Sequence, residues 1–191
     1  MCIKKYHRII EALLFASHKP INQSTIDKLF RDEKISLSNV IEKLNDQYSK
    51  HNHAFEIKAI AEGYQIVTKE EYELYIRTVN GKSSKFRPSK AFIDTIAIIA
   101  YKQPVSRSKI EFIRGVDSSG VLKTLLTKDL IKISGRSNAP GRPLLYKTTQ
   151  QFLDYIGINN LSDMPKINEI KQLVDARQQD QYQTEVFKKW D

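Results

Sequence analysis

The side chains best suited to catalysis or metal binding in this 191-residue chain are four histidines and one cysteine. The histidines are His7, His18, His51 and His53, and only the last two are close in sequence, with one asparagine between them. A metal site needs further Cys, His or carboxylate ligands at matching spacing, which this pair lacks. We interpret the pair as part of a solvated loop, and we expect no metal and no cofactor.

The cysteine gives no support for catalysis either. Cys2 stands near the start of the sequence without an evident base, so we interpret it as an ordinary thiol. The sequence contains no phosphate-binding glycine-rich motif and no nucleophile elbow. We therefore predict no catalytic residues. A single cysteine permits no internal disulfide, and a reducing cytoplasm is the expected compartment.

Hydrophobic residues make up 40% of the chain, which is compatible with ordinary packed cores. The longest uninterrupted apolar run, residues 96–101, is much shorter than the roughly 20 residues of a membrane-spanning helix. The first residues also lack the apolar core of a signal peptide. We expect no membrane contact.

The net charge of +9 is concentrated in one part of the sequence. Residues 1–80 contain 12 basic and 11 acidic side chains, and residues 166–191 contain five of each. Residues 81–165 contain 14 basic and six acidic side chains. Such a bias attracts polyanions, but it is equally compatible with a solvated surface that faces an acidic protein.

Two segments, residues 9–26 and 93–110, align without gaps at an offset of 84 residues. The identical positions are Ile9, Ala16, Pro20, Ser24 and Ile26, which match Ile93, Ala100, Pro104, Ser108 and Ile110. Each copy predicts an amphipathic helix ended by proline, a short extended segment and a second helix. The matched prolines favour duplication of one domain.

The remainder of both copies follows one order. In the first copy an apolar stripe from Leu37 to Tyr48 predicts a third helix, and alternation from Phe55 predicts a strand. Glu62 and Gly63 suit a two-residue turn that leads to a second strand over 64–68.

In the second copy, Ser106 and Asp117 suit the N-caps of helices that end near Ile113 and Lys128. Strands are predicted over 130–134 and 144–148. Helix, short strand, helix, helix and hairpin is the order of a winged helix. We predict an α+β fold, mainly α, with two tandem winged helix-turn-helix domains. Their bounds are 1–78 and 89–165, with a polar linker at 79–88 and a polar tail, helical or disordered, at 166–191.

Between the last two strands lies a loop with two prolines, a glycine and two arginines. Gly141 permits positive φ, and the prolines stiffen the chain. One interpretation is a rigid loop that presents Arg136 and Arg142 to a phosphate or carboxylate. The other is a tight hairpin that needs these residues to close, which the residue types favour.

Winged helices often read DNA with their third helix. Glu42 and Asp46 in the first copy would repel phosphates. The third helix of the second copy offers Ser119, Lys123, Thr124, Thr127 and Lys128, and lacks the Arg, Asn and Gln that supply most base contacts. Sequence-specific DNA binding is not expected, although a tandem winged-helix transcriptional regulator is the alternative function.

The first helix of the first copy is apolar over more than one stripe, which indicates that two of its sides are buried. We predict that this helix pairs with a second subunit through Tyr6, Ile10, Leu13 and Leu14. The alternative is the central helix of a three-helix core.

Residues 89–165 closely resemble the C-terminal domain of the segregation and condensation protein B family. The resemblance is carried by IAIIAYKQPV at 96–105, IRGV at 113–116, LKTLL at 122–126, GRPLLY at 141–146 and TTQQFL at 148–153. The first domain is similar through EALLFAS at 11–17 and GYQIVT at 63–68. In all, the resemblance covers roughly residues 5–165.

The resemblance implies a non-catalytic subunit of the bacterial SMC condensin complex, cytoplasmic and nucleoid-associated, in chromosome condensation and segregation during cell division. Family members dimerise through the N-terminal domain and hold the kleisin ScpA with the C-terminal domain, and the kleisin bridges the SMC ATPase heads. DNA contact is then auxiliary. Carried over to this sequence, the kleisin-binding positions are Tyr101, Lys102, Arg114, Gly141 and Arg142.

Overall fold

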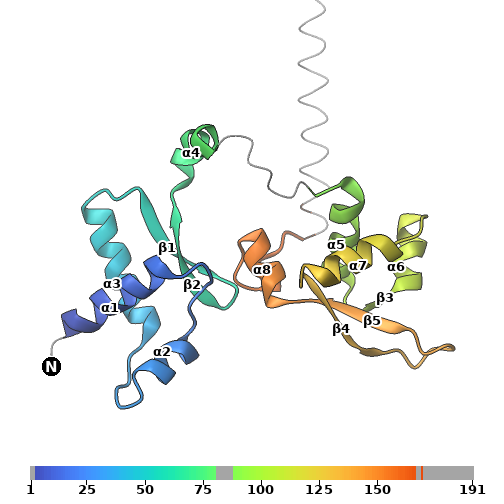
Figure 1. Ribbon diagram of the computed structural model, residues 1–191, viewed down its shortest axis with the longest axis horizontal. Helices are drawn as coiled ribbons and strands as arrows, with labels where there is room; N and C mark the ends of the chain where they lie inside the picture. Colours follow the sequence, from blue (N-terminus) through green and yellow to red (C-terminus); the bar gives the residue numbers. More distant parts are fainter. Residues whose placement is uncertain (1–2, 81–87, 167–168, 170–191) are drawn as a thin grey trace, which may run out of the picture. The chain divides into compact units, whose positions relative to one another are not determined.

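The computed structural model describes residues 3–80, 88–166 and 169 of the chain (Figure 1). It is a mixed helix and sheet structure, mainly helical, as predicted. The chain divides into two compact units, residues 1–160 and residues 161–191. Within the first unit we distinguish a first half, residues 3–80, and a second half, residues 88–160. The predicted tail helix lies outside the described residues.

The first half consists of four α-helices, a short 3-10 helix and a β-hairpin. Its elements are α1 (Ile3–Ala16), α2 (Gln23–Leu29), α3 (Leu37–Lys50), β1 (Phe55–Ile60), β2 (Gly63–Thr68), η1 (Glu70–Tyr72) and α4 (Glu73–Asn80). Asn22 and Ser36 cap α2 and α3, because each side chain accepts a hydrogen bond from a backbone N–H three residues later. Helix α4 was not predicted, and it includes the first two residues of the predicted linker.

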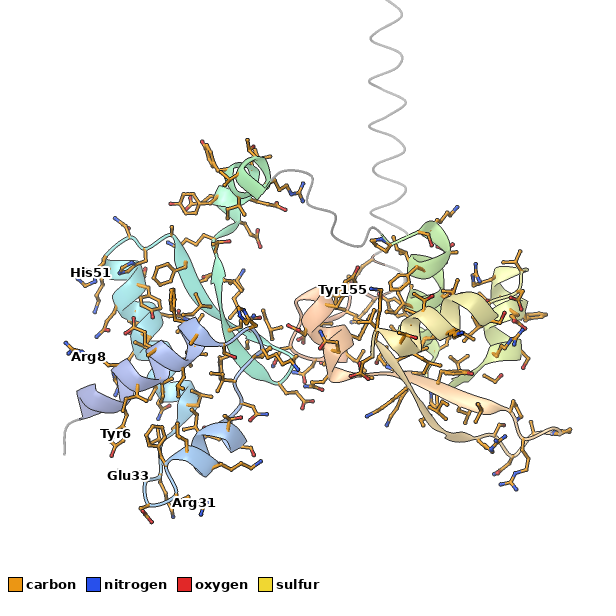
Figure 2. The ribbon with its side chains drawn as sticks, viewed as in Figure 1. Tyr6, Arg8, Arg31, Glu33, His51 and Tyr155 are labelled. Carbon is orange, nitrogen blue, oxygen red and sulfur yellow. The ribbon has the colours of Figure 1, made fainter. Side chains whose placement is uncertain are left out.

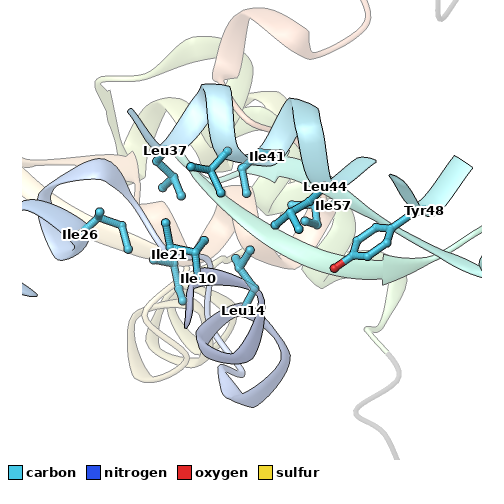
Figure 3. Packing of buried hydrophobic residues seen from close by; sticks show 10 residues of the cluster. Ile10, Leu14, Ile21, Ile26, Leu37, Ile41, Leu44, Tyr48 and Ile57 are labelled. Carbon is cyan, nitrogen blue, oxygen red and sulfur yellow. The ribbon is translucent and has the colours of Figure 1, made fainter. Parts of the chain in front are cut away.

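The core of the first half is formed by one face each of α1 and α3, closed by the hairpin (Figure 3). Its buried members are Ile10, Leu14, Ile21, Ile26, Leu37, Val40, Ile41, Leu44, Tyr48 and Ile57. Full burial of an aliphatic side chain of this size contributes about 1.5–3 kcal/mol. The Tyr48 hydroxyl donates to Glu11 Oε1 at 2.8 Å, and burial together with this hydrogen bond raises the pKa of Tyr48.

The turn of the first hairpin differs from the prediction. The strands pair Ile60 with Gly63, so the two-residue loop is Ala61 and Glu62 rather than Glu62 and Gly63. Both loop residues have positive φ, at 51° and 58°. The turn therefore adopts left-handed backbone without a glycine in it.

Gly63 is required for a different reason, the close approach of the segment before α2. A Cβ atom on Gly63 would lie 3.0 Å from the carbonyl oxygen of Ile21 and 3.0 Å from Pro20 Cβ. This approach allows Ile21 and Tyr64 to exchange two backbone hydrogen bonds, at 2.9 and 2.8 Å. The bridge fixes the extended segment that follows α1 against β2.

Side-chain amides hold the strands of both halves to neighbouring elements. In the first half, Asn45 on α3 bonds both backbone groups of Ile57, with its Nδ2 donating to the carbonyl and its Oδ1 accepting from the N–H, each at 2.8 Å. In the second half, Gln103 Oε1 accepts from the backbone N–H of Thr148 at 2.7 Å and from its hydroxyl at 2.9 Å. Buried strand groups thus keep hydrogen-bond partners outside the sheets.

The second half repeats the order of three helices and a hairpin and adds a short strand. Its elements are α5 (Lys90–Lys102), β3 (Val105–Ser106), α6 (Arg107–Arg114), α7 (Ser119–Thr127), β4 (Ile131–Arg136), β5 (Leu144–Thr148) and α8 (Gln150–Ile156). The strand order is β3-β5-β4, and α5 packs against α6, α7 and β5. A 3-10 helix, η2 (Leu161–Asp163), belongs to the second unit.

Two boundaries of the second half correct the predictions. Helix α7 has its N-cap at Ser118 rather than Asp117, although Asp117 Oδ2 accepts from the backbone N–H of Ser119 at 3.1 Å. Strand β4 continues to Arg136 instead of ending at residue 134, because a register shift after Ile133 absorbs one extra residue in the ladder. The cap at Ser106 is confirmed.

Candidate partner-binding surfaces

A pocket of about 630 Å³ lies between α5 and the end of α6. It is lined by Lys90, Ala91, Asp94, Ala97, Ile98, Ile113, Arg114 and Val116. The α5 lining follows a helical repeat, because residues 90, 94, 97 and 98 share one face of that helix. The other wall is the last turn of α6 and the residues that follow it. We call this feature the α5–α6 groove.

Exposed apolar side chains accompany this groove. Ile113 and Val116 in its lining are 44% and 56% exposed. Ile93 and Phe112, adjacent in sequence to lining residues, are 52% and 80% exposed. Grouped exposed apolar residues with charged neighbours are typical of protein-interaction surfaces.

The turn after α6 is held by a network of charged side chains. Arg107 donates to Glu111 Oε1 and to Asp117 Oδ1, each at 2.6 Å. Glu111 Oε1 also accepts from the backbone N–H of Ser118 at 3.0 Å. Arg114 donates to the Ser118 hydroxyl at 2.7 Å and to the Asp117 carbonyl at 3.3 Å. The network fixes the turn that carries one wall of the α5–α6 groove.

The pKa values in this turn follow from the same contacts. The Ser119 hydroxyl donates to Asp117 Oδ2 at 2.6 Å and, assisted by the Ser119 N–H and by Arg107, lowers the pKa of Asp117. The hydrogen bond to Glu111 raises the pKa of Arg107. Both groups therefore remain charged at neutral pH, and the turn is set by permanent charges.

The five sequence-predicted kleisin contacts come from three elements of the second half: α5, α6 and the loop between β4 and β5. Arg114 alone lines the α5–α6 groove, and its guanidinium is already bonded within the turn. Tyr101 and Lys102 are the last residues of α5, and Tyr101 follows the lining residues Ala97 and Ile98 by four and three positions, one turn beyond the groove on the same helix face. Gly141 and Arg142 belong to the loop between β4 and β5.

That loop closes through its own backbone while its arginines stay exposed. The Ser137 N–H donates to the Pro143 carbonyl and the Arg142 N–H to the Ala139 carbonyl, both at 2.9 Å. Arg136 donates to the Arg142 carbonyl at 3.2 Å. Gly141 has φ of 79°, which explains a glycine at this point. The loop thus combines a tight closure with two accessible cations.

The predicted dimerisation residues divide into two groups on α1. Ile10 and Leu14 are 0% and 2% exposed and fill the core of the first half, in agreement with the alternative of a central core helix. Leu13 is half-buried, and the half-buried Tyr6 donates to Glu33 Oε1 at 2.6 Å (Figure 2). That hydrogen bond raises the pKa of Tyr6. Phe15, absent from the prediction, is 83% exposed.

The histidine pair lies at the end of α3, near an aromatic cluster. His51 Nδ1 is 2.8 Å from the Gln47 carbonyl, and the rings of His51 and His53 are 6.2 Å apart. His53 contacts the Tyr48 ring edge-on at 5.3 Å.

Within residues 3–80, 88–166 and 169, no three His, Cys, Asp or Glu side chains are grouped so that they could bind a metal ion. In the same residues no helix has the length and apolar character to span a membrane.

Comparison with known proteins identifies the family. Residues 8–167 match the family described as segregation and condensation complex subunit ScpB. The chain is 39% identical over 165 residues to the segregation and condensation protein B of Syntrophotalea carbinolica, covering 86% of this chain and 83% of the relative. The protein of that name from Clostridium tetani is 37% identical over 166 residues, covering 87% and 88%. The chain belongs to the ScpB family.

Solved structures also show similarity. A conserved hypothetical protein from Chlorobium tepidum is 33% identical, with a TM-score of 0.39 over 81% of this chain and 97% of that one. ScpB from Mycobacterium tuberculosis is 23% identical, with a TM-score of 0.39 over 83% and 98%.

Proposed function

We propose that this chain is a non-catalytic subunit of a bacterial SMC condensin complex, acting in the cytoplasm at the nucleoid during chromosome condensation and segregation. Its second half binds the kleisin ScpA, which links it to SMC, and its first half pairs with a second copy. The observation that carries the proposal is the α5–α6 groove, whose exposed Ile113 and Val116 form an apolar wall in a chain of the ScpB family.

The chemistry of the groove suits an amphipathic kleisin segment. Ala97 and Ile98 provide small and aliphatic contacts on α5, opposite Ile113 and Val116. A helix that lays its apolar face into such a groove is a common mode of peptide recognition. Lys90, Asp94 and Arg114 in the same lining supply both signs of charge for orienting the segment.

The remaining predicted contacts take supporting roles in this proposal. Arg114 acts as a positioning residue, since its guanidinium holds the turn that carries Val116. Tyr101 and Lys102 at the end of α5, and Gly141 and Arg142 in the hairpin loop, are proposed as contacts for chain that continues beyond the groove.

We assign dimerisation to the half-buried edge of α1 beside its core face. Tyr6 and Leu13, which are half-buried and lie one beside the other on α1, contact the second copy there, while Ile10 and Leu14 anchor the helix from the core side. Phe15 points to the opposite side of α1 and is not part of this contact. The proposal also retains two winged-helix domains, at 1–78 and 89–165, with a linker at 79–88 and a tail at 166–191. Its support is the repeated order of three helices and a hairpin.

The test is the molar mass of the full chain by light scattering during size-exclusion chromatography, alone and with ScpA. A mass near twice 22.1 kDa alone, and a larger stable species with ScpA, is the expected result. Val116→Asp should abolish the larger species and keep the dimer. Tyr155→Asp, which changes an exposed aromatic residue on α8, is the matched control and should bind ScpA normally. A monomer that ignores ScpA would overturn the proposal.

A further inference from the structure

The net positive charge of the second half is concentrated on α7 and the β4–β5 hairpin, because the five basic side chains elsewhere in residues 88–160 are accompanied by four carboxylates. Residues 119–148 contain six basic side chains and one carboxylate, Asp129. The basic residues are Lys123, Lys128, Lys132, Arg136, Arg142 and Lys147, and all six are exposed. On α6, by contrast, Arg107 is paired with Glu111 and Asp117. We call residues 119–148 the basic helix–hairpin surface.

Within this surface two lysines face each other directly. Lys132 on β4 pairs with Lys147 on β5 in the antiparallel register. Neither strand contains an acidic residue, and no ion pair among the described residues involves either lysine. Like charges directly opposite in a sheet are destabilising. Bound anions would relieve the repulsion.

The exposed side of α7 indicates which anion fits. The hydroxyls of Thr124 and Thr127 donate to the carbonyls of Gly120 and Lys123, at 3.0 and 2.9 Å, so their protons are used within the helix. Among residues 119–127 there is no Arg, Asn or Gln to contact base edges. The lysines of α7 and the strands, with Arg136 at the end of β4 and Arg142 on the loop, instead match phosphates, which carry most sequence-independent binding.

We propose that the basic helix–hairpin surface binds the phosphate backbone of duplex DNA without sequence preference. An extended series of cations across a helix, two strands and a loop fits a long, regular polyanion. The corresponding helix of the first half, α3, carries exposed Glu42 and Asp46, so DNA binding is assigned to the second half alone. This surface shares Arg142 with the proposed kleisin contacts but none of the residues that line the α5–α6 groove. The variants that test the two proposals, Val116→Asp there and the Lys132 and Lys147 pair here, leave Arg142 unchanged, so the two proposals fail separately.

The test is fluorescence anisotropy of the full chain with two unrelated duplexes of about 30 base pairs, at about 50 to 200 mM KCl. The dissociation constants should be equal for both duplexes and rise steeply with salt. Lys132→Gln combined with Lys147→Gln should weaken binding about tenfold or more and reduce the slope against log salt by about 2. Lys43→Gln combined with Lys50→Gln makes the same change in net charge on α3 and should leave binding unchanged.

Three outcomes would overturn the proposal. One is an equal loss in the α3 control, which would mean that only net charge matters. Another is a clear preference for one duplex at fixed salt, which would indicate sequence reading. The third is poly-glutamate binding as tightly as DNA and depending equally on Lys132 and Lys147, which would assign the surface to an acidic protein. Circular dichroism melting of each variant establishes that the variants compared are folded.

Discussion

The two halves share an order of helices but close their hairpins in different ways. In the first half the strands join through Ala61 and Glu62, and the hairpin is pressed against the segment at Ile21. In the second half a loop of residues 137–143 separates the strands, and a register shift follows Ile133. The strands of the two hairpins are of similar length, but the first hairpin packs on the core through Ile57, whereas the longer loop of the second projects from the helices (Figure 1), with exposed arginines beside it.

The third helix of each half, α3 or α7, also differs between the halves, in length and in charge. Helix α3 has 14 residues and carries Glu42 and Asp46, while α7 has nine residues and no carboxylate. A repeated helix order therefore supports two surfaces of different chemistry. The common part of the repeat supplies the cores, and the hairpin and the third helix decide what each half presents to its surroundings.

The largest expected effects come from truncating the core of each half. Leu44→Ala and Leu125→Ala each remove a buried side chain, and each should lower the free energy of unfolding by about 2–5 kcal/mol. Hydrogen exchange read by mass spectrometry should rise first in the half that carries the substitution. Equal increases of hydrogen exchange in both halves for both variants would show that the two halves share one core. The view of two halves with separate cores would then be wrong.

Substitutions of two glycines should change stability in opposite directions, because one glycine is required by a close backbone contact and the other only lowers helix propensity. Gly63→Ala places a Cβ 3.0 Å from the Ile21 carbonyl oxygen and should destabilise the protein by about 1–3 kcal/mol, measured by urea denaturation. Gly120→Ala on α7 meets no atom within 4 Å and should stabilise the protein by about 0.5–1 kcal/mol. Equal effects of the two variants would contradict the role assigned to Gly63.

Lys147→Glu should act in opposite directions on stability and on DNA binding. The new carboxylate faces Lys132 across the strands, so the free energy of unfolding should increase by about 0.2–1 kcal/mol. Anisotropy should show weaker binding to duplex DNA in the same variant. A loss of stability together with a loss of binding would point to a disrupted hairpin instead of a removed phosphate contact.

The turn after α6 should weaken in acid. Hydrogen bonds from Ser119 and the nearby Arg107 stabilise the charged form of Asp117, whose pKa lies below its ordinary 3.8 in the folded state. A lowered native pKa gives stability that is present above 3.8 and lost as the pH falls through the native value. The melting temperatures of wild type and Asp117→Asn should therefore differ at pH 6 and converge below pH 3.8. A constant difference across this range would exclude the carboxylate as the cause.

Much of the fold follows from local sequence patterns, because helix periodicity and caps are local properties. The apolar stripe from Leu37 predicts the start of α3, and Ser106 caps α6 as expected. The predicted turn of the first hairpin is one residue too late, because glycine is the usual signal for a turn. Gly63 is instead required by its close contact with the backbone of Ile21. Nothing in the local pattern shows that contact, which joins residues 42 positions apart.

The candidate groove was less predictable. Ile98 and Ile113 are aliphatic residues of the kind that usually fill a core. They border a groove only because of the way α6 packs on α5, which the sequence does not show. Helix α8 was also missed, although the capping side chain of Thr149, which accepts from the Phe152 N–H, is a signal of its start. The family blocks contain Arg114, yet the sequence alone does not reveal that its guanidinium is bonded to Ser118.

The amide pair between Asn45 and Ile57 has a consequence for the behaviour of the protein at high local concentration. In the part of the chain that the structure describes, β1 has a single strand neighbour, β2, and the backbone groups of Ile57 that Asn45 bonds are not available to another chain. An open strand edge is a template for intermolecular pairing and aggregation. One asparagine on α3 thus blocks such pairing near the middle of the strand, where an added strand would otherwise gain its most regular hydrogen bonds.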